Sequence, residues 1–461
     1  MSRATTAMLS IWNPATGEVV DSLPADDAAA VAEKVATVKA GCAAWAATPL
    51  SKRIDILSSF RALVSQNVED LAQITCRETG KPITQARNEV RGLDGRLAYF
   101  LEHTAAHLQA LTVHSEPGLQ EQITWEPLGV VGNISAWNYP YFVGGNVFVP
   151  ALLTGNGVVY KPSEFAVKTG LHIAKLLWQA GVPQSALQVV VGGGAAGAAM
   201  LDSGINAAFF TGSYATGVRV AEQAARHLLK VQLELGGKDP VYVMPDADVA
   251  AAAAATADGA FYNAGQSCCA VERIYVHEAI YDAFVDQFVR TVDTFVVGDP
   301  LDEKTYIGPL TRPAQLDVLA EQVRDAREHG GKVLRGGARL DRVGFYFAPT
   351  VVADANHRMK LMRDESFGPV IGICKVSGDQ EAALLMNDTA YGLTAGVYGV
   401  DRDRAMRILR TMNTGSVYFN CCDRVSPRLP WSGRGHSGLG STLSTLGIQT
   451  FVQPKAWHLR G

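Results

Sequence analysis

The stretch Gly129-Val-Val-Gly-Asn-Ile-Ser135 is a short apolar run between small and polar residues. Such a run is typical of a strand that is buried on both faces of a sheet. Three similar runs follow, with helical segments expected between them near residues 146–153, 169–179 and 195–203: Gly157-Val-Val-Tyr160, Leu187-Gln-Val-Val-Val191 and Ala207-Ala-Phe-Phe210. Strands that alternate with helices at this spacing predict an α/β fold with a parallel, doubly wound sheet.

The chain on either side of this sheet carries further regular patterns. Before it, apolar residues at helical spacing predict helices over residues 26–45, 52–78 and 83–110, the first of them capped by Asp26 or Asp27. After it, a strand at residues 231–235 precedes an alanine-rich helix that Asp246 caps and that runs to about residue 261. Strands at residues 271–276, 370–376, 396–400 and 415–420 then complete a second predicted α/β lobe.

Two extended segments fit neither lobe. Residues 112–125 precede the first strand of the sheet, and residues 447–457 lie near the C-terminus. Because an unpaired strand edge invites association, we expect these segments to pair with each other or with a neighbouring subunit. A solvent-exposed hairpin is the alternative.

Composition limits the class of protein. At ~150 residues per domain, a chain of 461 residues suggests about three domains. Its net charge of -4 provides no basic field for a polyanion, so no nucleic-acid partner is expected. The seven cysteines form no C-x-x-C pair and no zinc-type spacing, so neither a disulfide framework nor a metal site is expected. Residues 1–14 lack the apolar core of a secretory signal and no later stretch is long enough to span a membrane, which predicts a cytoplasmic location with no membrane partner.

Two glycine patterns are candidates for binding a phosphate. Gly192, Gly194 and Gly197 form a G-x-G-x-x-G directly after a predicted strand, which alone would place a pyrophosphate at the next helix N-terminus. The acidic residue of a dinucleotide fingerprint is missing about twenty positions later, where Thr211-Gly-Ser213 stands instead. The second pattern contains Gly212 and Ser213 and also joins a strand to a helix, although an ordinary tight turn accounts for it equally well.

Two residues are candidates for chemistry. Cys268 follows a polar turn, Asn263-Ala-Gly-Gln-Ser267, where a thiol can be exposed enough to react, although most cysteines are small buried residues. Glu234 lies between the apolar residues Leu233 and Leu235 and precedes a pair of glycines. A carboxylate at the end of a strand is a site candidate, and a solvated residue on the strand face is the alternative.

Six motifs then occur in one order along the chain: Trp137-Asn138-Tyr139-Pro140, Lys161-Pro-Ser-Glu164, Phe210-Thr-Gly-Ser213, Leu233-Glu-Leu-Gly-Gly-Lys238, residues 261–268 and Glu365-Ser-Phe-Gly-Pro369. Together with Asn13-Pro-Ala-Thr-Gly17, they resemble the aldehyde dehydrogenase superfamily over nearly the whole chain. The resemblance implies a Rossmann-type NAD-binding domain (1–110 and 127–235), an α/β catalytic domain (236–440) and a small β oligomerisation arm (111–126 and 441–461). A homodimer or homotetramer is the expected assembly.

The resemblance also implies roles in catalysis. Cys268 would be the nucleophile that adds to the aldehyde carbon, forming a thiohemiacetal and later a thioester. Asn138 and the backbone N–H of Cys268 would hold the oxyanion, and Glu234 would be the general base that activates water. The presence of Glu234 argues for hydrolysis rather than transfer to coenzyme A, so the implied product is a free carboxylic acid.

The resemblance assigns further residues to the cofactor. Lys161 and Glu164 would hold the adenosine ribose, and the Glu164 carboxylate would repel a 2'-phosphate, so NAD is favoured while NADP stays possible. Glu365 and Phe367 would lie at the nicotinamide ribose and ring, and the Gly212–Ser213 turn would hold the pyrophosphate. The G-x-G-x-x-G would then only lie near the adenine. The complete set of cofactor candidates is Ser135, Trp137, Lys161, Glu164, Gly194, Gly212, Ser213, Glu365 and Phe367.

The substrate is less defined. The candidate pocket residues are Tyr139, Cys269, Cys422 and Arg424. The sequence departs from the common family pattern in two places: residues 430–438 replace the usual Gly-Gly-x-Lys run, and residues 420–424 lie where the family's substrate pocket is walled. Arg424 could anchor the carboxylate of a succinic-semialdehyde-type substrate, although a structural or surface arginine is the favoured reading. A cysteine esterase or thiol hydrolase that uses Cys268 without redox chemistry is the alternative from another class.

Overall fold

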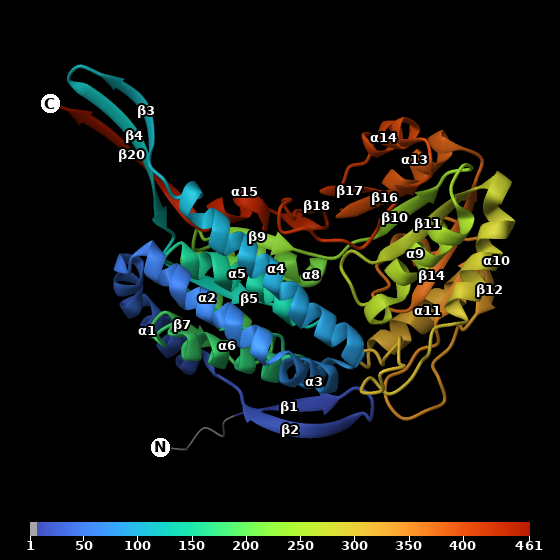
Figure 1. The fold of residues 1–461 in the computed structure, drawn as a ribbon. Coiled ribbons are helices and arrows are strands. Elements are labelled where there is room, and N and C mark those ends of the chain that lie inside the picture. Colours follow the sequence, from blue (N-terminus) through green and yellow to red (C-terminus); the bar gives the residue numbers. More distant parts are fainter. Residues whose placement is uncertain (1–6) are drawn as a thin grey trace.

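The structure, a computed structural model, describes residues 7–461. Two lobes lie side by side, and a thin arm of strands projects from the first lobe away from both (Figure 1). A hairpin of β1 (Met8–Asn13) and β2 (Glu18–Pro24) lies beneath the first lobe in this view. The fold thus consists of two lobes and an arm.

The first lobe is built on a six-stranded sheet with the order β19-β9-β8-β5-β6-β7. Its strands are β5 (Val130–Ile134), β6 (Gly157–Lys161), β7 (Leu187–Val189), β8 (Ala207–Thr211), β9 (Lys230–Glu234) and β19 (Gly438–Leu439). Neighbouring strands from β9 to β7 are parallel, and β19 pairs antiparallel with β9. The prediction of a parallel sheet from the four apolar runs is therefore confirmed.

Helices cover both faces of this sheet because successive side chains of a buried strand point to opposite sides. Val130 and Ile134 pack with α1, while Val131 between them packs in the core on the other face. The first face is covered by α1 (Ala28–Ala47), α7 (Gly194–Asp202) and α8 (Tyr214–Ala225). The other is covered by α2 (Leu50–Gln66), α4 (Ile83–His107), α5 (Pro140–Leu153), α6 (Val167–Ala180) and α15 (Ser444–Gln449), with α3 (Val68–Thr79) against α4 and α6.

Two local predictions in the helices are wrong. The single helix expected over residues 52–78 is two helices, because Asn67 leaves the helical conformation at φ -113° and its side-chain amide donates to the carbonyl of Leu63. The alanine-rich helix α9 (Val249–Phe261) is capped by Asp248 rather than Asp246. The Asp246 carboxylate instead accepts from the backbone N–H groups of Val400 and Asp401.

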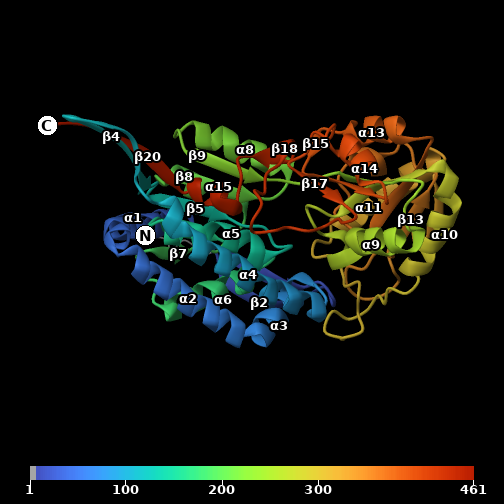
Figure 2. The same ribbon diagram turned by 45° about the horizontal axis from the view of Figure 1, so that its top comes forward.

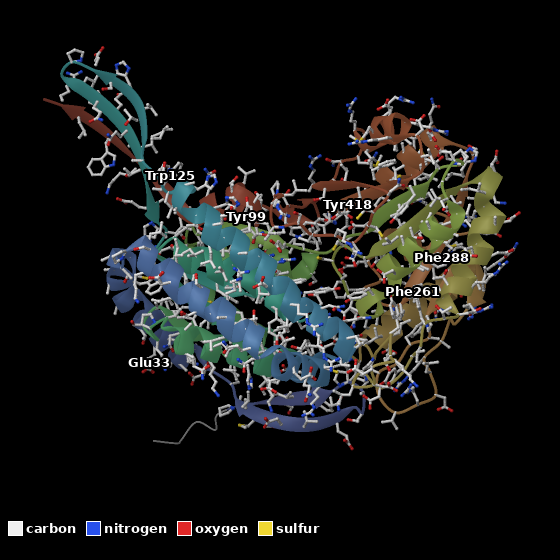
Figure 3. The ribbon with its side chains drawn as sticks, in the orientation of Figure 1. Glu33, Tyr99, Trp125, Phe261, Phe288 and Tyr418 are labelled. Carbon is white, nitrogen blue, oxygen red and sulfur yellow. The ribbon has the colours of Figure 1, made fainter. Side chains whose placement is uncertain are left out.

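The second lobe contains a seven-stranded sheet with the order β12-β13-β14-β11-β10-β16-β17. Its strands are β10 (Asp239–Val243), β11 (Val271–His277), β12 (Lys332–Arg335), β13 (Thr350–Ala353), β14 (Val370–Val376), β16 (Thr394–Tyr398) and β17 (Ser416–Phe419). One face packs on α9 and α10 (Tyr281–Val292), where the rings of Phe261 and Phe288 lie 6.3 Å apart (Figure 3). The other face packs on α11 (Gln315–Glu328), α12 (Lys360–Arg363), α13 (Asp379–Asn387) and α14 (Arg402–Leu409).

The arm is a three-stranded sheet of β3 (Leu111–Glu116), β4 (Leu119–Pro127) and β20 (Val452–Arg460). Strand β20 pairs antiparallel with β4 along its whole length, and both views show these strands clear of the two lobes (Figures 1 and 2). The expectation that the two extended segments pair with each other is confirmed. The boundary expected at residue 441 is too early, because α15 packs on α4 and α5 of the first lobe and only β20 joins the arm.

Within the described residues, no helix is both long enough and apolar enough to cross a membrane.

Candidate active site

The carboxyl ends of β5, β6, β8 and β9 lie along one edge of the first sheet because these strands are parallel. The chain proceeds outward from β5 to β6 on one side and from β8 to β9 on the other, so the order reverses between β5 and β8. Ligands of open α/β sheets bind at such a switch point. Ser135, Lys161, Gly212 and Glu234 end or follow these strands, which explains why motifs far apart in the sequence meet here.

A cleft of about 280 Å³ opens at this edge. It brings together Trp137, Gly212, Ser213, Glu365 and Phe367 of the predicted cofactor set. The same cleft is lined by Asn138, Glu234 and Cys268. The remaining cofactor candidates, Ser135, Lys161, Glu164 and Gly194, are not part of its lining.

Those remaining candidates lie close to one another on the sheet edge. The backbone N–H of Ser135 donates to the carbonyl of Lys161 at 3.0 Å, and the Lys161 ammonium lies 3.7 Å from the Glu164 carboxylate. A Cβ at Gly197, in the first turn of α7, would lie 3.6 Å from Lys161 Cδ, while one at Gly194 would meet nothing within 4 Å. Gly194 thus borders open space, and Glu164 beside Lys161 is partly exposed.

The start of α8 fits a phosphate group. Ser213 is the N-cap residue of this helix, but its side chain makes no capping hydrogen bond to the helix backbone. The first N–H groups of a helix lack partners within the helix, and the helix dipole favours an anion at this end. Ser213 lines the cleft, so the residues present fit a dinucleotide whose phosphates lie at the Gly212–Ser213 turn.

A second chamber of about 470 Å³ adjoins the cleft. Asn138, Glu234 and Cys268 line this chamber as well as the cleft. The thiol, the carboxyl group and the side-chain amide therefore lie where the two spaces meet. A molecule in the chamber and another in the cleft would therefore both lie against Cys268.

The turn that carries Cys268 is held by both lobes. Asn263, Ala264 and Gly265 all have positive φ, at 54°, 54° and 70°, which bends the chain sharply after α9. The backbone N–H of Asn263 donates to Gln85 Oε1 at 2.8 Å, and Asn138 Nδ2 donates to the carbonyl of Gln266 at 3.2 Å. The turn leaves Cys268 partly exposed while Cys269 is buried.

Gly237 allows the chain that leads to β10 to pass close to Cys268. A Cβ at this position would lie 2.6 Å from the carbonyl oxygen of Cys268, a distance that real Cβ atoms do not reach. Glycine at position 237 is therefore needed so that the chain between β9 and β10 passes directly beside the turn that carries Cys268.

Glu234 ends β9 and is only 6% exposed, so it is not the solvated residue of the alternative interpretation. Its carboxyl accepts from the Thr442 hydroxyl and from Gln232 Nε2 at 3.3 Å. Burial raises the pKa of Glu234 to about 7, against the lowering effect of the Thr442 hydrogen bond and of the Arg96 charge. A carboxyl group that titrates near neutral pH is suited to taking a proton from water.

Glu365 and Phe367 are positioned by a buried ion pair that the sequence reading missed. Glu272 on β11 accepts from the backbone N–H groups of Ser366 and Phe367 and from the Lys238 ammonium at 2.5 Å. This holds Phe367 at a φ of 47°. Glu365 Oε1 accepts from the backbone N–H of Gly237 at 3.0 Å, and burial raises the Glu365 pKa to about 7.

The predicted substrate residues separate in the structure. Tyr139, Cys269 and Arg424 line the chamber, whereas Cys422 is not in its lining. The Cys422 thiol is packed in the core of the second lobe, donates to the carbonyl of Ala255 and accepts from the Tyr398 hydroxyl. This corrects the assignment of Cys422 to the pocket, and the reason is the irregular chain after β17, where Asp423 has a φ of 47°.

Arg424 and Cys269 both bond to Asp423. Arg424 is exposed, and its guanidinium donates to the backbone carbonyl of Asp423 at 3.2 Å. The Cys269 thiol donates to Asp423 Oδ1 at 3.0 Å. Burial raises the Asp423 pKa to about 7. Asp423 and Asp258 therefore place carboxyl groups in the same chamber as Arg424, which the sequence reading did not foresee.

Arg96 was also missed, because the helix that carries it was interpreted only as packing. It shares the inner face of α4 with Leu93, Leu97 and Phe100 and is 6% exposed. Its guanidinium donates to Asn146 Oδ1 at 2.7 Å and lies 3.9 Å from the centroid of the Phe142 ring. An arginine at a position of apolar helical spacing was the signal in the sequence.

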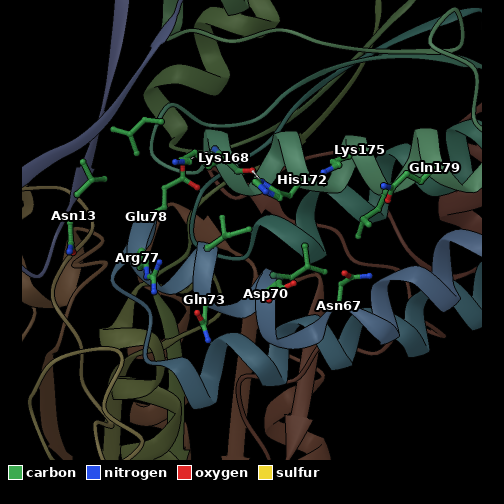
Figure 4. Close-up of a pocket in the computed structure, with 15 residues that line it drawn as sticks. Asn13, Asn67, Asp70, Gln73, Arg77, Glu78, Lys168, His172, Lys175 and Gln179 are labelled. Carbon is green, nitrogen blue, oxygen red and sulfur yellow. Dashed lines mark hydrogen bonds between the residues drawn. The ribbon is translucent and has the colours of Figure 1, made fainter.

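A larger cavity of about 690 Å³ lies between α3 and α6, away from these residues (Figure 4). Asp70 and Gln73 line one side and Lys175 and Gln179 the other. At its end, the buried Glu78 accepts from the backbone N–H groups of Lys168 and Thr169 and so caps the start of α6. The contacts of Glu78 are those of a structural cap.

Across residues 7–461, no group of three or more His, Cys, Asp or Glu side chains is arranged to hold a metal ion.

Comparison with known proteins places this site in a family. The family model described as "Aldehyde dehydrogenase family" matches residues 1–457. The chain is 32% identical to a chloroplastic betaine aldehyde dehydrogenase of Amaranthus hypochondriacus, covering 97% of this chain and 92% of the relative. It is 33% identical to a succinate-semialdehyde dehydrogenase [NADP(+)] of Deinococcus radiodurans, covering 96% and 93%.

Comparison with solved structures gives the same family. The crystal structure of an NAD-dependent aldehyde dehydrogenase from Sinorhizobium meliloti superposes with a TM-score of 0.96 at 34% identity, covering 98% of this chain and 91% of that one. The α/β fold is thus that of known aldehyde dehydrogenases. The chain belongs to the aldehyde dehydrogenase family, whose reaction is the oxidation of an aldehyde.

Proposed function

We propose that this protein oxidises an aldehyde to a free carboxylic acid with NAD, using Cys268 as nucleophile and Glu234 as general base. The observation that supports this most directly is that Asn138, Glu234 and Cys268 line both the cofactor cleft and the second chamber. A reaction that joins a substrate in one space to a cofactor in the other needs its reacting groups at that junction.

The chain's own residues supply the covalent chemistry. The Cys268 thiolate adds to the aldehyde carbon, so that a C–S bond forms and the carbonyl oxygen becomes an oxyanion. The Asn138 amide and the backbone N–H of Cys268 donate to that oxyanion, and loss of such a donor costs ~2.7 to 4 kcal/mol of barrier. The chemistry supplied by bound NAD is acceptance of a hydride at its nicotinamide.

Hydrolysis then releases the product. Glu234 accepts a proton from water, the resulting hydroxide adds to the acyl carbon of the Cys268 thioester, and the thiolate leaves. General base catalysis of this kind contributes roughly 10²- to 10⁴-fold to a rate. Because the Glu234 pKa is raised to about 7, the base is ionised above neutral pH and hydrolysis should slow as the pH falls below 7.

The cofactor would be held along the sheet edge. Lys161 and Glu164 would bind the adenosine ribose with Ser135 and Gly194 beside them. Gly212 and Ser213 would bind the pyrophosphate, and Trp137, Glu365 and Phe367 would enclose the nicotinamide ribose and ring. The partly exposed Glu164 carboxylate supports NAD over NADP, because a 2'-phosphate would meet a like charge.

Replacing Glu164 by glutamine is expected to weaken the preference for NAD. The change removes the repelling charge and frees Lys161 to face a 2'-phosphate, so the ratio of kcat/KM with NAD to that with NADP should fall by about tenfold, or ~1.4 kcal/mol. Initial rates with each cofactor at a fixed aldehyde concentration measure the ratio. Glu33→Gln, at an exposed position on α1 (Figure 3), is the matched control and should keep the wild-type ratio. A wild-type enzyme with a higher kcat/KM for NADP would remove Glu164 from this role.

The proposal about the substrate concerns the charge that the aldehyde carries. The succinic-semialdehyde alternative depends on Arg424, which is exposed and shares the chamber with the carboxyl groups of Asp258 and Asp423. At pH 8, above its pKa of about 7, the Asp423 carboxyl is mostly ionised. These two carboxylates favour neutral or cationic aldehydes over anionic ones.

An aldehyde panel tests the reaction and its substrate together. At pH 8 and fixed NAD, we expect NADH formation with aliphatic and amino aldehydes, and kcat/KM about tenfold lower for a carboxylated aldehyde of equal length. A marked preference for succinic semialdehyde would support Arg424 as its anchor and contradict the charge argument.

An assay that omits NAD distinguishes the cysteine esterase alternative from aldehyde oxidation. No histidine is among the residues that line the chamber in the described chain, so Cys268 has no imidazole partner there. An ester offered without NAD should therefore turn over more slowly than an aldehyde with NAD. The opposite order of rates would favour the esterase.

The arm supports a further part of the proposal, which is assembly into a homodimer or homotetramer. Leu111, Val113, Trp457 and Leu459 are exposed apolar side chains on its strands. Such side chains on a projecting sheet are suited to contact with a second subunit.

A further inference from the structure

Among the residues that the structure describes, Arg96 is a buried cation that has no carboxylate within ion-pair distance. The buried lysines Lys81 and Lys238 each contact a carboxylate, from Glu89 and Glu272. Arg96 instead bonds to the neutral amide of Asn146 and lies over the Phe142 ring. Burying a charge without a counter-ion is costly, and burial lowers the Arg96 pKa only to about 10, so the guanidinium stays protonated at neutral pH.

Arg96 lies in the chamber that contains the proposed catalytic residues. Arg96, Glu234 and Cys268 line the same chamber. The hydrogen-bond partners of Glu234, Thr442 and Gln232, are uncharged. The other charged group from α4 in this chamber, Glu89, is neutralised by Lys81. The titratable groups that line the chamber with Arg96 include Glu234, Glu89, Cys269 and Cys268, and the charged groups Asp258, Asp423 and Arg424 lie there as well.

We propose that Arg96 is a positioning residue whose buried charge keeps the Glu234 carboxyl ionised, so that Glu234 can take the proton of the hydrolytic water. The inference rests on the proposed function, because it assigns a partner to the general base of that reaction. Asn146 and Phe142 act by holding the guanidinium in the chamber. The role needs a permanent cation, which arginine supplies even when buried.

The physical basis is the balance of two opposing effects on one carboxyl group. Burial disfavours the carboxylate and raises the pKa of Glu234, while a nearby positive charge lowers it by stabilising the ionised form. Without Arg96, only the neutral hydrogen bonds would oppose burial. The base would then be mostly protonated at neutral pH and recover only in alkaline solution.

The pH dependence of deacylation tests this proposal. Cys268 is acylated with an activated ester, and the decay of the acyl mass on the intact protein is followed between pH 5.5 and 9.5, a range that brackets the Glu234 pKa of about 7. For Arg96→Met we expect the acid limb to move upward by about one pH unit, with a tenfold slower decay at pH 6 and a near wild-type rate at pH 9. Arg96→Lys should restore most of the wild-type profile.

Two further variants make the result specific. Arg91→Met removes an exposed arginine from the same helix, outside the chamber lining, and should leave the profile unchanged. Asn146→Ala removes the acceptor that orients Arg96 and should shift the acid limb in the same direction by less. If Arg96→Met does not fold, Asn146→Ala still decides, because an unchanged profile in that variant would overturn the proposal.

The possible outcomes distinguish a failure of the proposed role of Arg96 from a failure of the proposed function. An acid limb that stays in place in folded Arg96→Met overturns the proposed role of Arg96. If that variant also raises KM for a carboxylated aldehyde, Arg96 is instead a substrate anchor. Absence of an acyl group on Cys268 in the wild-type protein, together with no NADH formation from any aldehyde, would instead overturn the proposed function.

Discussion

Cys268→Ala is expected to abolish aldehyde-dependent NADH formation, with a loss on the order of 10⁴-fold or more. No C–S bond can form, and no other thiol takes its place, because the neighbouring Cys269 is buried and bonded to Asp423. The variant should still bind NAD, since the cleft residues other than the thiol are unchanged. Absorbance at 340 nm measures turnover, and titration calorimetry measures NAD binding.

The control for this variant is Cys42→Ala, a partly buried cysteine on α1, which should retain wild-type turnover. Its volume change is the same, but it lies outside the cleft and the chamber. A Cys268→Ala protein that oxidises aldehydes at the wild-type rate would show that the covalent mechanism is wrong. Loss of NAD binding together with activity would instead point to misfolding of the Asn263–Gln266 turn.

Glu234→Gln has the second largest expected effect. Glutamine has the same shape and its amide oxygen can still accept from Thr442, but it cannot take a proton from water. Acylation should proceed, so we expect a burst of about one NADH per active site followed by turnover slowed roughly 10²- to 10⁴-fold. Rapid-mixing absorbance follows the burst, and intact mass spectrometry detects the acyl group on Cys268.

The surface variant Glu33→Gln again provides the comparison, since it also exchanges a carboxylate for an amide. It should show neither a distinct burst nor accumulation of an acyl-enzyme. Steady turnover of Glu234→Gln near the wild-type rate, with no added mass on Cys268, would assign the base to another group.

Much of the first lobe could be predicted from local pattern. The four apolar runs are strands because each is too short for a helix and buried on both faces, as β5, β6, β7 and β8 are. Helix ends were harder to predict, because several residues in each region can serve as a cap. Asp248 rather than Asp246 begins α9, and Asn67 divides a periodic pattern that continues through it.

Some residues of the candidate site could be predicted from the sequence and others could not. Motifs with unusual chemistry, such as the cysteine after a polar turn or the carboxylate before two glycines, could be found in the sequence. Residues that only pack beside them could not. Arg96 looks like part of an amphipathic helix, and Cys422 looks like a neighbour of Arg424, although its thiol is buried in the other direction.

By itself, the sequence determined which elements form and which residues carry chemistry. Strand and helix periods, glycine positions and the order of the motifs depend on neighbours within a few residues, so they can be read along the chain. Only the tertiary structure decided which charges face one another. The burial that moves the Glu234 pKa to about 7, the isolated cation of Arg96 and the carboxyl groups of Asp258 and Asp423 arise where distant segments close around one chamber. The strength of a charge there depends on the water that those segments exclude, which is a property of the folded shape.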